Sequence, residues 1–268
     1  MTGIFTILTD LTHQTFLATA TQRRIRAIHF KCDENHRFGE YIFIHAIAIS
    51  LKIMYSNRSK KRTDMKIREI QLQTHDLDGL KTFYRDKLGL PILRQGKRAF
   101  TVGIGNSRIK FSIAEDDDKP YYHFAINIPE NQLAEAKKWL SERVALIEKD
   151  GQNEFRFESW NADAIYFYDP VGNIVELIAR HNLRNASPKP FSAESLLSIS
   201  EIGHPVDNVR LFCEHIRAEL RLRLWDGDER TFAAVGDEEG LFIVVPINRP
   251  WFPADKPAEN YPIAVDVV

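Results

Sequence analysis

A carboxylate within an apolar strand is the feature of this sequence that points most directly to chemistry. The segment Ile165–Glu176 ends in a strand whose side chains alternate between two faces. Glu176 shares its face with Ile174 and Ile178, and the opposite face is also apolar. A buried lone carboxylate is costly, so Glu176 should lie beside a cation, a hydrogen-bond donor or a metal. The alternative, a solvated Glu176 on an edge strand, is disfavoured by these neighbours.

The residues before this strand predict a tight turn. Asp169–Asn173 combines a proline, which fixes φ, with a glycine that can adopt positive φ. A turn that leads into a strand with one inward carboxylate is a suitable geometry for a metal ligand.

Three further strands have one apolar and one polar face. The polar faces carry Glu69, Gln71 and Gln73; Arg108, Lys110 and Ser112; and His123, Ala125 and Asn127. A polar concave face suits a wet pocket, although antiparallel sheets also expose ordinary solvated faces.

Bulk properties exclude several classes of protein. The chain has 268 residues, 27% charged and 44% hydrophobic, with a net charge of −1, so neither nucleic acid nor an anionic membrane is an expected partner. Cys32 and Cys213 show no disulfide or zinc spacing. We expect a cytoplasmic protein with a small-molecule substrate, and we leave a homodimer open.

The first 64 residues differ from the rest, because they lack a sustained period and end in a basic run. We expect Met65 to be the biological start, with residues 1–64 an extension that carries no chemistry. A mobile N-terminal arm is the competing interpretation.

From residue 65 the elements follow the order βαβββ twice, over 65–180. The predicted strands and helices lie near 67–74, 77–88, 91–94, 98–103, 107–114, 121–128, 130–143, 145–149, 155–158, 163–168 and 173–179. A polar linker, 181–195, precedes a third copy, which matches the first at a constant offset of 132 residues. The segment 261–268 resembles 121–128, so the region 196–268 is a degenerate, incomplete second module.

Together these segments resemble the vicinal oxygen chelate superfamily, which includes glyoxalase I, bleomycin-resistance proteins and extradiol ring-cleavage dioxygenases. The resemblance is carried by Ile70–Leu90, His123–Ile126 and Asp169–Glu176. It implies an α+β fold in which paired βαβββ units form a U-shaped, eight-stranded mixed sheet with helices outside. One such fold carries many reactions.

The resemblance also implies a metal site on the concave face, with Glu69, His123 and Glu176 as ligands. One histidine and two carboxylates suit Fe(II) or Mn(II), which we favour, and also Zn(II), Ni(II) or Co(II). Lys110 stands where some members have a fourth ligand, and it could instead pair with Glu69 or Glu176 and leave no metal.

The region after 196 is expected to hold no metal. Glu201 corresponds to Glu69, but Pro262 stands opposite His123 and cannot act as a ligand.

Three functions follow. The first is a metal-dependent ring-cleavage dioxygenase, which the segment containing Tyr166 resembles, with Glu69 and Tyr166 as catalytic residues. This sequence departs from that class at two places. Glu69 stands where the class usually has histidine, and the acid–base histidine of the class is missing around Phe157–Ser159. The second is a glyoxalase- or epimerase-like lyase or isomerase, in which Glu69 moves a proton. The third is a metal-free protein that binds a small molecule, as resistance proteins do.

The expected pocket residues are Gln71, Phe100, Lys110, Asn127 and Trp160.

Overall fold

The computed structural model describes residues 51–55, 65–114 and 118–268, the first of these as backbone only. The prediction for residues 1–64 therefore falls largely outside the described residues. Within residues 1–64, Leu51–Tyr55 forms strand β1.

Each repeat begins with a strand and a helix and continues with strands that return to the first. We call the three repeats units 1 to 3. Unit 1 contains β2 (Ile67–Thr74), α2 (Leu77–Thr82), the π-helical turn η1 (Phe83–Lys87), β3 (Ile92–Gln95), β4 (Ala99–Ile104) and β5 (Ser107–Ile113). Asp76 caps α2 by accepting a bond from the backbone N–H of Gly79.

Units 2 and 3 follow the same order. Unit 2 contains β6 (His123–Ile128), α3 (Leu133–Ser141), β7 (Phe155–Phe157), η2 (Glu158–Trp160), β8 (Ala162–Tyr168) and β9 (Ile174–Arg180). After η3 (Ala193–Ser195), unit 3 contains β10 (Ser198–Val206), α4 (Val209–Leu220), β11 (Leu224–Gly227), β12 (Ala233–Asp237) and β13 (Gly240–Pro246). The strand predicted near 145–149 is reduced to isolated bridges at Leu146 and Lys149.

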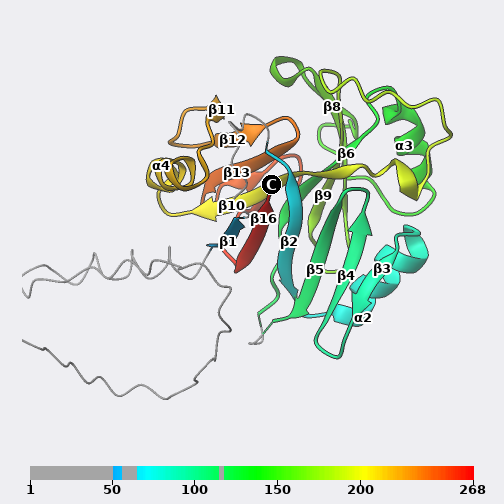
Figure 1. Cartoon of the computed structure of the whole chain (residues 1–268). Helices are drawn as coiled ribbons and strands as arrows, with labels where there is room; N and C mark the ends of the chain where they lie inside the picture. The colour runs from blue at the N-terminus through cyan, green and yellow to red at the C-terminus, as the bar shows by residue number, and fades with distance from the viewer. Residues whose placement is uncertain (1–50, 56–64, 115–117) are drawn as a thin grey trace, which may run out of the picture. The chain divides into compact units, whose positions relative to one another are not determined.

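The first strand of each complete unit pairs in parallel with its last strand: β2 with β5, β6 with β9 and β10 with β13. Between units, β6 pairs with β10 in antiparallel register, so units 2 and 3 share the strand order β7-β8-β9-β6-β10-β13-β12-β11. Figure 1 shows this sheet with α3 and α4 beside it. The predicted mixed α+β, sheet-dominated fold is confirmed, but unit 2 completes its eight-stranded sheet with unit 3, not with unit 1.

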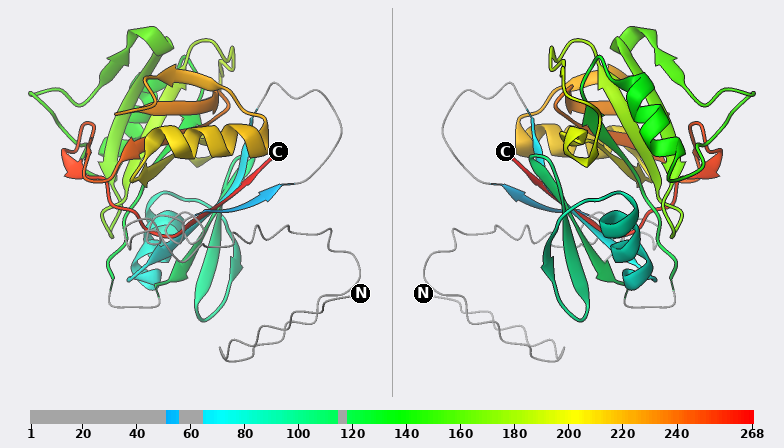
Figure 2. Two further views of the ribbon diagram at one scale, coloured as in Figure 1. Left: turned by 90° about the vertical axis from the view of Figure 1, so that its left-hand side faces the viewer. Right: turned by 90° about the vertical axis from the view of Figure 1, so that its right-hand side faces the viewer.

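Unit 1 pairs with the end of the chain. Its strand β2 lies antiparallel to β16 (Ile263–Val267), and β16 lies parallel to β1. A single bridge between Ile67 and Ile199 joins this half to the other. The side views in Figure 2 show β16 running alongside the strands of unit 1.

The sheet of units 2 and 3 separates two apolar clusters. Phe124, Val175 and Leu177 lie in the larger cluster, with residues of the helices, whereas Ala125 and Ile178 lie in the cluster on the other face. The predicted alternation in β6 and β9 therefore matches the structure. The concave face is, however, mainly apolar and aromatic, with polar groups concentrated at its centre.

A short strap crosses that concave face after β13. It runs over residues 247–258 and contains the small hairpin of β14 (Pro250–Trp251) and β15 (Lys256–Pro257). Trp251 is buried against His123, with ring centroids 4.9 Å apart. Gly203 permits this, because a Cβ there would come within 2.8 Å of the Trp251 ring.

Candidate metal and substrate site

Three buried side chains from three neighbouring strands converge on the concave face. His123 comes from β6, Glu176 from β9 and Glu201 from β10, and one potential ligand atom of each lies within 4.8 Å of the others. The register explains this convergence, since Glu176 and Glu201 both stand beside Ala125, on either side of β6.

His123 presents a free nitrogen to the group. Its Nδ1 lies 3.2 Å from the carbonyl oxygen of Ile174, which can only accept, so Nδ1 carries the proton. Nε2 is then unprotonated and faces Glu176 Oε2 at 3.7 Å. Burial lowers the pKa of His123 to about 4, opposed by the bond to Ile174, so the imidazole is neutral at neutral pH.

Glu176 lacks a full countercharge. Burial raises its pKa well above the usual range, and the charge of Glu201 adds to the effect, while Arg180 and a hydrogen bond from Tyr166 oppose it. Burial and the charges of Glu176 and Glu201 raise the pKa of Tyr166 well above 10, so its hydroxyl stays protonated.

Glu201 has a cation of its own. The fully buried Arg180 donates from Nη2 to Glu201 Oε1, and its Nε donates to Ser200 Oγ at 3.1 Å. The guanidinium also lies over the rings of Trp160 and Trp225, at 5.3 and 5.7 Å. Because Arg180 donates to Oε1, the other carboxylate oxygen of Glu201 remains available as a metal ligand.

A cavity of about 280 Å³ contains this group. Its walls are largely aromatic, and the strap supplies part of them. The lining residues are His123, Phe157, Trp160, Tyr166, Glu176, Ile178, Glu201, Asp226, Phe232, Ile243, Arg249, Trp251 and Phe252.

The donor set fits a divalent metal. Ligands about 2.1 Å from an ion lie roughly 3 to 4 Å apart, so a small contraction of the 4.8 Å group is enough. The imidazole is neutral with its lone pair exposed, and Glu176 is a buried carboxylate that a cation would stabilise. One histidine and two carboxylates suit Fe(II), Mn(II) or another first-row ion.

Four of the predicted site residues lie together. His123, Glu176, Tyr166 and Trp160 all line the cavity. Trp160 is held there by a 2.6 Å bond from its Nε1 to Asp226.

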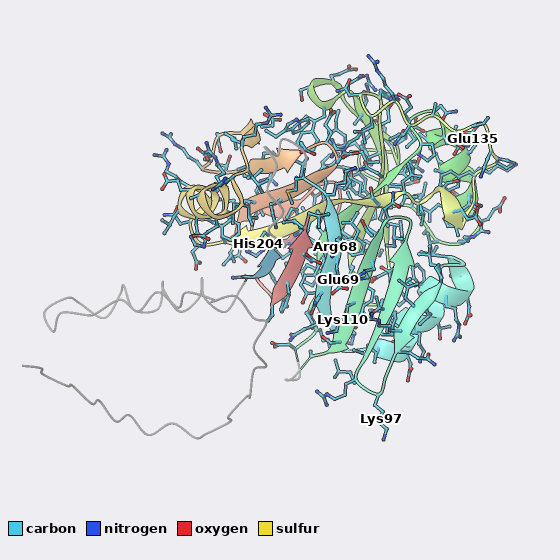
Figure 3. All side chains as sticks on the ribbon, viewed as in Figure 1. Arg68, Glu69, Lys97, Lys110, Glu135 and His204 are labelled. Atoms are coloured by element: carbon cyan, nitrogen blue, oxygen red, sulfur yellow. The ribbon has the colours of Figure 1, made fainter. Side chains whose placement is uncertain are left out.

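The other predicted residues lie elsewhere. Glu69 belongs to β2, where it accepts bonds from Arg108 and Gln71, and Lys110 contacts Gln71 at 3.5 Å. Figure 3 shows Glu69 and Lys110 on the strands of unit 1.

Phe100 packs against Phe111 in the core, and Asn127 is buried outside the cavity lining. These side chains were predicted to face the pocket on the premise that units 1 and 2 alone form the eight-stranded sheet, but β10 of unit 3 lies between β2 and β6.

Glu201 takes the place expected for Glu69. The sequence offset identified it as the equivalent residue, but unit 3 was set aside because Pro262 replaces the histidine. In the structure, Glu201 instead lies near His123 of unit 2, because β10 pairs with β6. The sequence also allowed a site in which Lys110 pairs with a carboxylate and no metal binds. In the structure, Arg180, not Lys110, pairs with a site carboxylate, Glu201.

Comparison with known proteins identifies the family to which part of the chain is similar. Residues 66–177 match the model of the Glyoxalase/Bleomycin resistance protein/Dioxygenase superfamily. The chain carries a domain of this superfamily. The predicted resemblance to the vicinal oxygen chelate superfamily is therefore confirmed over these residues.

Solved structures share the fold at low identity. A glyoxalase I variant from Zea mays is 16% identical, over 76% of this chain and 75% of that one, with a TM-score of 0.50. A Bacillus subtilis protein assigned as a dioxygenase is 17% identical, over 70% of this chain and 66% of that one, with a TM-score of 0.47. The present chain thus spans just under two thirds of that protein.

A fosfomycin resistance protein from Listeria monocytogenes, solved with Mn(II), is 19% identical over 44% of this chain and 91% of that one, with a TM-score of 0.34. No curated protein matches the sequence. Among the described residues, no helix has both the length and the apolar character needed to cross a membrane.

Proposed function

We propose that the protein is a divalent-metal-dependent enzyme resembling ring-cleavage dioxygenases. Its substrate would be a small molecule that chelates the ion through adjacent oxygens. The observation that supports this most is the placement of His123, Glu176 and Glu201 inside an aromatic cavity. Such a set leaves coordination positions open for a substrate.

Each residue has a role in this proposal. His123, Glu176 and Glu201 would hold the ion, which when bound supplies Lewis acidity to substrate oxygens. Arg180 orients Glu201 and offsets part of the buried negative charge. The protonated Tyr166 hydroxyl donates a hydrogen bond to Glu176 and so orients that carboxylate, and Trp251 packs against His123 and excludes water from it.

A lyase or isomerase is the second candidate. Glu176 favours it, because burial and the neighbouring charge of Glu201 raise its pKa well above the usual range, which makes its carboxylate a stronger base. The carboxylate that would move a proton is then Glu176, whereas sequence analysis gave this role to Glu69.

A metal-free binding protein is the third candidate, favoured by the Arg180–Glu201 ion pair, which neutralises one carboxylate without a metal. We also propose a reducing, cytoplasmic location, with which the free buried thiol of Cys213 is consistent.

Oxygen uptake tests the first candidate. The protein is loaded with Fe(II) or Mn(II), supplied with a panel of catechols, and followed with an oxygen electrode. We expect uptake that Glu176→Gln abolishes and that Glu69→Gln, the control on β2, leaves intact. Metal binding without oxygen uptake, together with solvent deuterium entering a hydroxyketone or hemithioacetal substrate, would favour the second candidate. Failure to bind any of these metals would favour the third.

A further inference from the structure

The cavity contains a cation that the metal site does not use. Arg249 belongs to the strap and lines the cavity wall, where its guanidinium lies 5.5 Å from the centre of the Phe232 ring. Within 65–114 and 118–268, the guanidinium makes no ion pair and no hydrogen bond. Arg249 is only half-buried, but burial still lowers its pKa. A partly desolvated guanidinium without a partner is suited to bind an anion.

The neighbouring carboxylates are already engaged. Asp226 accepts bonds from Trp160 Nε1 at 2.6 Å and from its neighbour Gly227 at 2.8 Å. Asp228 acts on Arg249 only through its charge at longer range. Its oxygens accept the backbone N–H groups of the turn at 230–232, which holds the pKa of Asp228 far below its usual range. Neither carboxylate is free to move to Arg249 without breaking these bonds.

The rest of the wall suits a flat apolar group. Phe157, Trp160, Tyr166, Phe232, Trp251 and Phe252 all line the cavity. Rings of this kind bind another ring through stacked or edge-to-face contacts. A volume of about 280 Å³ is near the lower end for small-molecule sites, so it suits one or two fused rings.

The cavity lining carries both carboxylates and a cation. Glu176 and Glu201 repel an anion, while Arg249 attracts one. A ligand with a single carboxylate would therefore place that carboxylate beside Arg249 and its neutral part beside Glu176 and Glu201.

We propose that the natural ligand is an aromatic carboxylate, whose carboxylate binds Arg249 while its ring packs among the cavity aromatics. The proposal rests on the proposed function only for the end of the ligand that faces His123, Glu176 and Glu201. Binding of the carboxylate by Arg249 needs no metal.

The test uses isothermal titration calorimetry on the metal-free full chain with two probes, 1-naphthoate and its neutral amide, 1-naphthamide. We expect wild-type protein to prefer naphthoate by about tenfold or more, as a charge-assisted hydrogen bond would give. Arg249→Met should abolish the preference and leave naphthamide affinity unchanged, and Arg249→Lys should keep part of it. Arg210→Met, at an exposed position on α4, is the matched control and should behave as wild type.

Three results would overturn the proposal: equal binding of the two probes by wild type, no binding of either probe, or a preference that survives Arg249→Met. A Mn(II) titration of the same samples separates this proposal from the metal site. Naphthoate selectivity without Mn(II) binding would count against the proposed enzyme alone. Mn(II) binding without naphthoate selectivity would count against Arg249 alone.

Discussion

His123 and His204 are both buried histidines on neighbouring strands, yet their surroundings give them different roles. His123 has a backbone partner for Nδ1 and two carboxylates near Nε2. His204 lies on the opposite face of the sheet, stacked on Phe212 of α4 at 4.3 Å, and neither of its ring nitrogens has a hydrogen-bond partner in the described part of the chain. It therefore carries a desolvation cost without a compensating bond.

We predict that His204→Leu stabilises the protein by about 1 to 2 kcal/mol, because it removes two unsatisfied buried polar atoms. Urea denaturation of the full chain measures this. The control is His215→Leu on the exposed part of α4, which should change stability by less than about 0.5 kcal/mol. A lower denaturation midpoint for His204→Leu would show that the imidazole has a partner in solution.

The pH dependence of stability should also report on His204. Burial lowers its folded-state pKa from 6.5 to about 4. Between these values the unfolded chain binds a proton that the folded chain does not, so stability falls as the pH drops below about 6.5. Denaturation at about pH 7 and about pH 5 should show a smaller loss for His204→Leu than for wild type. An equal loss in both proteins would contradict the prediction.

At the scale of elements, the turn before β9 positions Glu176. The buried carboxylate of Asp169 accepts bonds from the backbone N–H groups of Val171 and Asn173 at 3.2 and 3.0 Å, and from Asn173 Nδ2 at 2.7 Å. Tyr84 of η1 donates a further bond at 2.9 Å, so this turn also ties unit 1 to unit 2.

We predict that Tyr84→Phe destabilises the protein by about 1.5 to 3 kcal/mol, because a buried carboxylate loses a donor. Thermal and urea denaturation measure the loss. Tyr168→Phe, at a largely exposed ring, serves as the control and should be close to neutral. If the two variants were equally stable, the Tyr84–Asp169 bond would have no net effect.

The local sequence pattern predicted the helices and strands well, but it predicted poorly which strands pair with each other. The helix expected over 77–88 is present as α2 followed by η1, and the helix expected over 209–220 coincides with α4. Alternation also assigned Glu176 and His123 to the correct face. It could not decide whether β6 pairs with β2 or β10, because backbone hydrogen bonds are alike for either neighbour. That choice moved the second carboxylate of the group from Glu69 to Glu201.

At the scale of the molecule, the candidate site lies between units 2 and 3, and all its residues fall between His123 and Phe252. Unit 1 and β16 form the other half of the sheet, with β1 along the edge of β16. We predict that a chain beginning at Met65 keeps the metal affinity of the full chain, because His123, Glu176 and Glu201 all lie after Met65. Calorimetric titration with Mn(II) compares the two. A weaker affinity for the shorter chain would mean that the N-terminal segment supports the site.

The central claim is that one divalent ion is held by His123, Glu176 and Glu201, and calorimetric titration with Mn(II) tests it most directly. The informative pair is Glu201→Gln and Glu69→Gln, two equivalent positions in units 3 and 1, of which only the first faces the cavity. We predict one ion per chain for wild type and Glu69→Gln, and an affinity lower by more than about 100-fold for Glu201→Gln. Unchanged binding by Glu201→Gln, or its loss in Glu69→Gln, would contradict the account.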